Sequence, residues 1–259
     1  MKPINITKLT GKKGTERQVW ATAYDAWMAS IIDGLVDVIL VGDSLGMMVQ
    51  GQDTTLPVTL DEMIYHTKMV ARGCKSSFLV ADMPFMSYQV STSVALESAG
   101  RLLKEGGAKA VKLEGGFSQV ETIKALTQVG IPVVGHLGMT PQSVHAFGGF
   151  GKQAKTENGQ KHLLEEALAI TEAGCFAVVL ENVPHDIARD ITQAIGAVTI
   201  GIGAGGDTDG QVQVFHDLFG LDPNFSPKHA VVYSQMGTEM QEITKRFAQD
   251  VREKKLVSN

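Results

Sequence analysis

The sequence has few cysteines and no long apolar run, and these shortages exclude several classes of protein. Only Cys74 and Cys175 occur among 259 residues, far apart and without a CxxC spacing, so neither a disulfide framework nor a zinc knuckle is expected. No uninterrupted apolar stretch approaches the roughly 18 residues that a membrane-spanning helix needs. The N-terminal residues also lack the apolar centre of a signal peptide. We therefore expect a cytoplasmic protein that does not contact a membrane.

Basic residues are also scarce, and they form no dense run. The chain has 23 Lys and Arg against 28 Asp and Glu, which gives a net charge of −5. A nucleic-acid partner requires a basic surface, so we expect no nucleic acid and favour small-molecule substrates. With 259 residues, 44% of them hydrophobic, the chain is long enough for one barrel-sized domain or two small ones.

What the sequence does contain is a series of short apolar runs, each followed by an ionisable residue. Residues 38–41 form an unbroken run that ends in Gly42, Asp43 and Ser44. Such a run is typical of a strand that is buried on both faces of a parallel sheet. Four later runs end in the same way, and the ionisable residues there are Asp82, Glu114, His136 and Glu181. Ligands of α/β proteins bind outside the carboxyl ends of the strands, so these five endings predict an active site.

Helical patterns that end at glycine alternate with these runs along the chain. A run at 199–202 and an alternating segment at 211–216, which could also be helical, raise the number of βα units to eight. We therefore predict an α/β fold, a (β/α)8 TIM barrel in a single domain over residues 1–259, with a C-terminal helix at 236–255. A doubly wound open sheet is the alternative. Ionisable residues on consecutive strands favour the closed ring over a sheet with one switch point.

Three carboxylates, Asp43, Asp82 and Glu114, are expected at neighbouring strand ends. Like charges so close together repel each other unless a cation neutralises them. Ligands made only of oxygen suit a hard divalent ion such as Mg²⁺, which keeps water or substrate oxygens in its remaining positions. The alternative is three unrelated acids that cap helices.

Lys112, His136 and Glu181 add groups for binding and for proton transfer. Lys112 lies two residues before Glu114, so both side chains share one face of the strand, here the barrel interior. A buried lysine needs an anion, which could be a substrate carboxylate or a structural partner, and a Schiff-base role is also open. His136 could donate a hydrogen bond to a carboxylate or an oxyanion, and Glu181 suits a general base. Together these groups suit the enolisation of a 2-oxo acid.

The segments around these residues resemble those of a known family. They are VGDSLG at 41–46, TLPVT at 55–59, IYHT at 64–67, ADMPF at 81–85, VKLEGG at 111–116, GHLGMTPQ at 135–142, LENVP at 180–184, IGIGAG at 200–205 and DGQV at 209–212. On these segments the chain is similar to the ketopantoate hydroxymethyltransferase family, which belongs to the phosphoenolpyruvate mutase/isocitrate lyase-like superfamily of barrels.

The resemblance implies an activity and a role for each site residue. The reaction would transfer a hydroxymethyl (one-carbon) group from 5,10-methylenetetrahydrofolate to 3-methyl-2-oxobutanoate, giving 2-dehydropantoate in pantothenate (coenzyme A) biosynthesis. Glu181 would be the catalytic base, and the chain would form a homodecamer. Mg²⁺ would be held by Asp43, Asp82 and Glu114. The 2-oxo acid would contact Asp43, Ser44, Asp82, Lys112 and His136.

Two other functions stay open at this point. One is a related enolate-forming lyase, which is expected to carry a catalytic cysteine in a lid loop. The other is a non-catalytic barrel that binds a metabolite, which is expected to have lost the base or the metal-binding acids.

Overall fold

The computed structural model describes residues 3–225, 227 and 230–255. The chain divides into two compact units, Met1–Val212 and Gln213–Asn259, and each is described by itself. The expected single domain over 1–259 includes residues outside the described set, and it stays a prediction.

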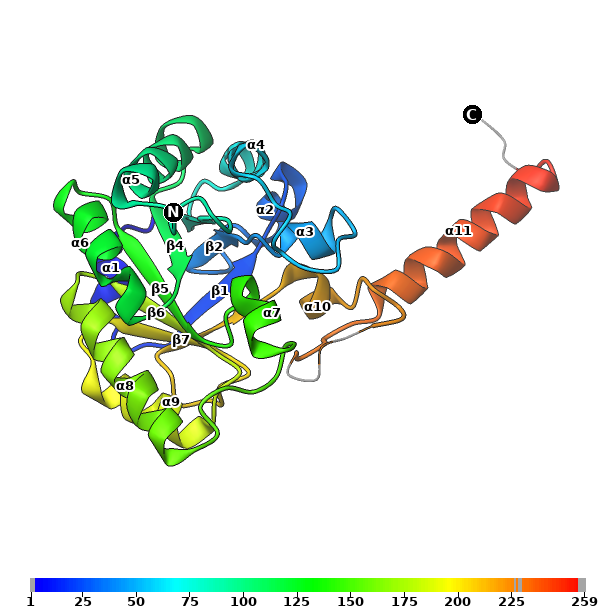
Figure 1. Cartoon of the computed structure of the whole chain (residues 1–259). Helices are drawn as coiled ribbons and strands as arrows, with labels where there is room; N and C mark the ends of the chain where they lie inside the picture. The colour runs from blue at the N-terminus through cyan, green and yellow to red at the C-terminus, as the bar shows by residue number, and fades with distance from the viewer. Residues whose placement is uncertain (1–2, 226, 228–229, 256–259) are drawn as a thin grey trace. The chain divides into compact units, whose positions relative to one another are not determined.

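Eight strands close into a barrel in the order in which they occur along the chain (Figure 1). Each strand from the first to the seventh pairs in parallel with the next one. The strands are β1 (Gln18–Thr22), β2 (Val38–Val41), β3 (Phe78–Asp82), β4 (Ala110–Glu114), β5 (Val133–Gly138), β6 (Ala177–Glu181), β7 (Val198–Ile202) and β8 (Gly210–Gln213). The predicted (β/α)8 barrel is therefore confirmed, and the open sheet is excluded.

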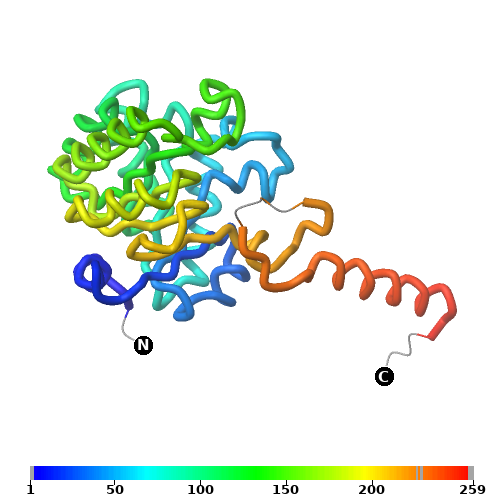
Figure 2. The backbone as a smooth tube through the Cα atoms, turned by 90° about the horizontal axis from the view of Figure 1, so that it is seen from below, coloured from blue at the N-terminus to red at the C-terminus, as the bar shows by residue number. Residues whose placement is uncertain are grey.

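Helices follow most of the strands and can be traced by colour in Figure 2. Those of the first unit are α1 (Ile6–Thr10), α2 (Ala26–Ile32), α3 (Leu45–Met48), α4 (Leu60–Gly73), α5 (Thr92–Arg101), α6 (Val120–Gln128), α7 (Val144–Phe147), α8 (Glu157–Glu172) and α9 (His185–Ala194). Three short turns add to them, η1 (Leu102–Gly106), η2 (Phe117–Gln119) and η3 (Pro141–Ser143). Residues 203–209 join β7 to β8 without a helix.

Local sequence explains where individual helices begin. Thr59 and Glu62 form the capping box that precedes α4, each side chain accepting a hydrogen bond from the other residue's backbone N–H. Helix α8 begins at Glu157, a few residues before its apolar pattern starts, because the Thr156 side chain accepts a hydrogen bond from Gly159 N.

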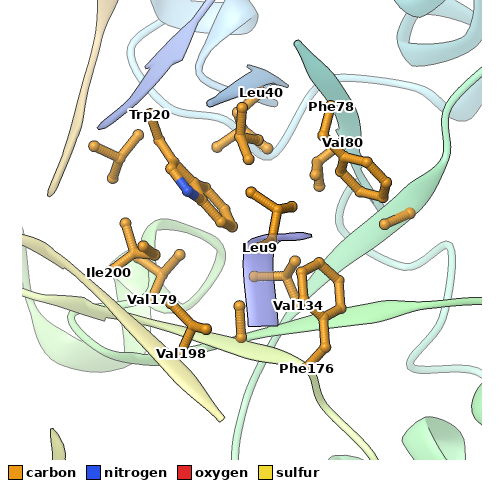
Figure 3. Packing of buried hydrophobic residues seen from close by; sticks show 14 residues of the cluster. Leu9, Trp20, Leu40, Phe78, Val80, Val134, Phe176, Val179, Val198 and Ile200 are labelled. Carbon is orange, nitrogen blue, oxygen red and sulfur yellow. The ribbon is translucent and has the colours of Figure 1, made fainter. Parts of the chain in front are cut away.

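The amino-terminal half of the barrel interior is apolar. Figure 3 shows Leu9 of α1 surrounded by side chains from the strands, among them Trp20, Val80, Val134 and Ile200, all buried in one cluster. Burial of each large apolar side chain stabilises the fold by about 1.5–3 kcal/mol. Because side chains of a strand alternate between its faces, the residues two positions later on the same strands also face the interior, at the other end of the barrel.

The second unit contains α10 (Phe215–Phe219) and α11 (Met236–Arg252). Gly237 N donates a hydrogen bond to Gly220 O over 2.9 Å, which ties the start of α11 to the residue that follows α10. The segment 211–216, expected as a strand or a helix, is the end of β8 followed by the start of α10. Across the part of the chain that the structure describes, no helix is both long and apolar enough to cross a membrane.

Candidate active site

The register of the parallel strands brings the predicted site residues together. Asp82 of β3 pairs with Lys112 of β4, and Glu114 of β4 pairs with His136 of β5. All four side chains are buried. The interior residues that precede these four on the same strands are apolar. The sheet therefore places two anions and two cations next to one another at the carboxyl ends of the strands, as the sequence predicts.

A continuous row of contacts crosses the mouth of the barrel. Lys112 Nζ lies 3.1 Å from Asp82 Oδ1 and 3.3 Å from His136 Nδ1. His136 Nδ1 is also 3.4 Å from Glu114 Oε1, and His136 Nε2 is 3.2 Å from Glu181 Oε2. The Glu181 side chain is 16% exposed against 3–5% for the other four, so it is the member of the row most open to solvent.

Asp43 and Ser44 follow β2 and extend this row. Asp43 N donates a hydrogen bond to Asp82 Oδ2 over 3.0 Å. The Ser44 hydroxyl lies 2.9 Å from the hydroxyl of Tyr24. A Cβ atom at Gly42 would come within 2.6 Å of Ser44 Oγ, so the preceding residue must be glycine for this close turn.

The three carboxylates do not share one electrostatic environment. Burial, followed by repulsion from Asp82 and Glu114, raises the pKa of Asp43 well above its usual range. Burial also raises the pKa of Asp82, although Lys112 opposes this. Burial acts in the same direction on Glu114, but the contact with His136 and the nearby Lys112 outweigh it, so the pKa of Glu114 is lowered.

The two cations keep their charge in this environment. Burial alone would lower the pKa of Lys112, but Asp82, Glu114 and Asp43 outweigh it and raise that pKa. A lysine that stays protonated is a poor Schiff-base nucleophile, so the anion-binding role remains. Burial and Lys112 act to lower the pKa of His136, but Glu114 and Glu181 raise it to about 9. His136 is therefore a donor at neutral pH.

The carboxylate oxygens fit a cation that needs few protein ligands. Asp82 Oδ1 and Glu114 Oε1 are buried, and no donor is aligned for a hydrogen bond with either. Among the described residues, no group of three or more His, Cys, Asp or Glu side chains could hold a metal ion by itself. Mg²⁺ is commonly held by one or two carboxylates together with water and substrate oxygens, so a site with few protein ligands suits this ion.

Comparison with known proteins identifies the family. Residues 3–258 match the family model of ketopantoate hydroxymethyltransferase. A 3-methyl-2-oxobutanoate hydroxymethyltransferase of Clostridium beijerinckii is 49% identical over 253 residues, 97% of this chain and 92% of that protein. The Leptospira interrogans protein of that name is 47% identical over 254 residues, 97% of this chain and 96% of that protein. The chain belongs to the ketopantoate hydroxymethyltransferase family.

Membership of this family makes the chain an enzyme, a hydroxymethyltransferase, and confirms the prediction from its motifs. The lyase and the binding protein are no longer needed as alternatives. Cys74 follows α4 and Cys175 lies between α8 and β6, so neither lies in a lid loop, where a lyase cysteine is expected.

Solved structures of low sequence identity share the fold of this family member. Phosphonopyruvate hydrolase matches with a TM-score of 0.63 at 11% identity, over 96% of this chain and 88% of that chain. A 2,3-dimethylmalate lyase, described as a phosphoenolpyruvate mutase/isocitrate lyase superfamily member, matches with a TM-score of 0.60 at 15% identity, over 95% and 87% of the two chains. Both proteins therefore share the barrel fold of this chain.

Two uncharged residues of the site, Gln142 and Tyr88, were not predicted as site residues. Gln142 Nε2 donates a hydrogen bond to Asp43 Oδ2 over 2.8 Å, and the Tyr88 hydroxyl donates one to Gln142 Oε1 over 2.6 Å. Both are buried. A search for ionisable residues at strand ends does not find them, because neither is charged and both lie in the loops that follow β3 and β5.

The long loop after β5 is fastened beside Glu181. Asn182, the next residue, has a positive φ of 47° and accepts a hydrogen bond from Gln153 N over 3.0 Å. Its side-chain Nδ2 donates to Phe150 O over 3.2 Å. The irregular segment after α7 therefore borders the carboxylate predicted to be the base.

Proposed function

We propose that this family member transfers the one-carbon unit of 5,10-methylenetetrahydrofolate to 3-methyl-2-oxobutanoate, giving 2-dehydropantoate for pantothenate biosynthesis. The observation that carries the proposal is the pairing of Glu181 with His136 over 3.2 Å, at a barrel mouth where β2 and β3 deliver Asp43 and Asp82. A partly exposed base and a buried cluster of charges are thereby parts of one site. The shared name of the relatives supports the same activity.

Asp43 and Asp82 would hold Mg²⁺, and Glu114 would complete the metal site through Oε1. The support is the pair of buried oxygens without an aligned donor, Asp82 Oδ1 and Glu114 Oε1. A phosphonopyruvate hydrolase of the same fold was solved with oxalate and Mg²⁺, and oxalate carries two adjacent oxygens as a 2-oxo acid does. When bound, the ion supplies a Lewis acid for the keto oxygen.

Lys112 and His136 would bind the carboxylate of the 2-oxo acid. Lys112 Nζ lies 3.3 Å from His136 Nδ1, so the two side chains are close enough to contact the same anion. Ser44 lies next to Asp43 and would add a hydroxyl contact. Asp43 and Asp82 would lie against the same substrate.

Glu181 would then remove the proton from C3 of the bound 2-oxo acid. The electron pair of the broken C–H bond becomes the double bond of the enolate, and the proton moves to a Glu181 oxygen. C3 next forms a bond to the methylene carbon of the folate, and both C–N bonds that hold this carbon break in turn. One water supplies the hydroxyl group and a proton for one folate nitrogen, and the proton taken up by Glu181 goes to the other nitrogen. His136 Nε2, which lies 3.2 Å from Glu181 Oε2, would keep a positive charge beside the base.

Proton NMR in D₂O tests the base. The chain is mixed with Mg²⁺ and 3-methyl-2-oxobutanoate, with and without methylenetetrahydrofolate, and loss of the C3 proton or formation of the hydroxymethyl product is followed. We expect Glu181→Gln to slow both by roughly 10³-fold, within the range of general-base catalysis. Glu166→Gln is the matched control, because Glu166 Oε1 also faces a histidine, His162, at 3.6 Å but lies on α8.

The two parts of the proposal fail in different ways. If the wild-type chain neither exchanges the C3 proton nor forms product, the proposed substrate is wrong. If the wild-type chain reacts and Glu181→Gln reacts equally fast, the substrate stands and Glu181 is not the base.

We also propose a homodecamer in the cytoplasm. Helix α11 supports assembly, because Met236, Met240, Ile243 and Phe247 recur at helical spacing and each is at least 40% exposed. Cys74 and Cys175 are free thiols, which suits a reducing compartment. Light scattering of the purified chain measures the number of copies, and a monomer would contradict the assembly.

A further inference from the structure

We propose that Gln142 is a positioning residue for the charged site, and that Tyr88 fixes the orientation of the Gln142 amide. Gln142 would hold Asp43 and Glu114 so that one oxygen of each faces the cation and the 2-oxo acid. The role of Asp43 in this scheme rests on the proposed function.

Gln142 uses its whole hydrogen-bonding capacity inside the protein. Its side-chain Nε2 donates to Asp43 Oδ2 over 2.8 Å and to Met83 O over 2.9 Å. Its Oε1 accepts from the Tyr88 hydroxyl over 2.6 Å and from Gln89 Nε2 over 3.1 Å. A primary amide has two donor hydrogens and two acceptor lone pairs, so all four positions are filled. The amide is therefore held in a single orientation.

Tyr88 determines which end of that amide meets Asp43. Its hydroxyl accepts from Glu114 N over 3.1 Å, and it donates to Gln142 Oε1 over 2.6 Å, a shorter contact than that to its alternative acceptor, Glu114 O, at 3.2 Å. A flipped amide would place its oxygen against the Asp43 carboxylate and Met83 O, which is repulsive, and the Tyr88 hydroxyl would lose its shorter acceptor. Tyr88 therefore favours the orientation that directs the donor of Gln142 at Asp43.

Gln142 also holds a second carboxylate through its backbone. Its N–H donates to Glu114 Oε2 over 2.9 Å. Asp82 has an equivalent restraint, since Asp43 N donates to Asp82 Oδ2. One oxygen of each of the three acids is thus fixed by a protein donor, while Asp82 Oδ1 and Glu114 Oε1 keep no aligned donor. Gln142 provides two of these three restraints.

A neutral donor suits this position better than a charged one. An amide holds a carboxylate by a hydrogen bond without cancelling its charge, so Asp43 stays attractive to a cation. A lysine or arginine there would compete with that cation, and a glutamate would add a fourth acid to a cluster that already repels itself.

Binding of Mn²⁺ to the whole chain without substrate, followed by electron paramagnetic resonance, tests the inference. Gln142→Met is similar in volume and removes both donors, and we expect its Kd for Mn²⁺ to rise at least 10-fold, as for partners that orient metal ligands. Tyr88→Phe leaves the amide free to turn, and we expect a smaller rise of roughly 3-fold, below the range for direct partners.

Gln18→Met is the matched control. Gln18 is an equally buried glutamine, whose Nε2 donates to Leu9 O over 2.8 Å and whose Oε1 accepts from Trp20 Nε1 over 3.0 Å. It lies at the amino-terminal end of β1, so its replacement should lower the melting temperature without changing the Kd for Mn²⁺. A purely structural role of Gln142 would give the same result as Gln18→Met.

Asp43→Asn separates this inference from the proposed function. If Asp43→Asn leaves Mn²⁺ binding unchanged, the proposed metal site is wrong, and the inference is overturned with it. If Asp43→Asn weakens binding but Gln142→Met and Tyr88→Phe bind as the wild type does, the metal site stands and the positioning role is overturned. Should Gln142→Met fail to fold, Tyr88→Phe alone decides, because it removes one hydroxyl and no carbon.

Discussion

Two buried aspartates at opposite ends of the barrel show how differently one chain treats the same side chain. Asp209, before β8, is 7% exposed and accepts hydrogen bonds from Lys13 Nζ, Gly14 N and Thr199 N over 2.8–3.0 Å. Burial alone would raise the pKa of Asp209, but these donors outweigh it and the pKa is lowered. Asp43, at the other end, is 3% exposed, and its pKa is raised well above the usual range.

The difference shows that burial does not decide whether a carboxylate stabilises the fold. What decides it is whether donors or like charges surround the group. At the amino-terminal end the surroundings are donors, and the carboxylate ties loops to strands. At the carboxyl end the neighbours of Asp43 include two further acids, so that end stores repulsion that a cation can relieve. The first arrangement contributes stability, and the second suits catalysis.

Moving a charge from the catalytic end into the apolar end should have the largest effect. Val80 lies two residues before Asp82, on the same strand and the same face, but it is packed in the apolar cluster. Val80→Asp would bury a carboxylate with no donor, which costs several kcal/mol even if the group is protonated. We expect no folded protein, measured as loss of a cooperative thermal transition by circular dichroism.

Val90→Asp is the control for this change, because Val90 is 59% exposed. It should melt within a few degrees of the wild type. A Val80→Asp variant that melts normally would mean that the two ends of the barrel interior do not differ as described.

Removing a charge from the catalytic end should abolish activity and leave stability nearly unchanged. Asp82→Asn takes one acid from the cluster and relieves the repulsion that raises the pKa of Asp43. We expect hydroxymethyl transfer to fall by roughly 10³-fold, because a proposed metal ligand is lost. The free energy of unfolding should change by less than about 1 kcal/mol, since Lys112 keeps Glu114 and Asp43 as anionic neighbours. If Asp82→Asn were strongly destabilised but its folded molecules kept full activity, Asp82 would serve stability and not catalysis, and the contrast between the two ends of the barrel would be wrong.

The sequence was sufficient to predict where ionisable side chains gather in the barrel, because the presence of such a residue at the end of an apolar run is read directly from the sequence. Each buried apolar run ends in an ionisable residue, and parallel pairing then forces those residues together, as with Asp82 and Lys112. Gln142 and Tyr88 carry no charge and lie in loops, and Gln142 was noted only as the last residue of a family motif, so neither was assigned to the site. Their importance depends on which groups they meet, and that is set by the three-dimensional path of the loops.

Other details depended on tertiary context in the same way. The pattern at 93–104 predicts one helix, but α5 gives way to a π-helical turn at Leu102–Gly106. Only seven residues, 203–209, separate β7 from β8. Asp209, within that link, was noted only as part of a family motif. Its donors, Lys13 and Thr199, come from distant parts of the chain.

Asp209→Asn should give the smallest effect and has a defined pH dependence. Because the pKa of Asp209 is lower in the folded chain than in the unfolded one, the ionised group adds stability above the unfolded value, and this stability disappears as the pH falls through the folded value. We expect the variant to be less stable by about 2 kcal/mol at pH 7, mainly through loss of the Lys13 ion pair, and the difference to shrink below about pH 4. Urea unfolding of both proteins from pH 7 to pH 3 measures the difference directly.

Asp190→Asn is the matched control, because Asp190 is exposed and pairs with the neighbouring Arg189. The effect of this change on the free energy of unfolding should stay within about 0.5 kcal/mol at every pH. A difference for Asp209→Asn that stayed constant with pH would show that Asp209 acts through its shape and not through its charge, and the contrast with Asp43 would then fail.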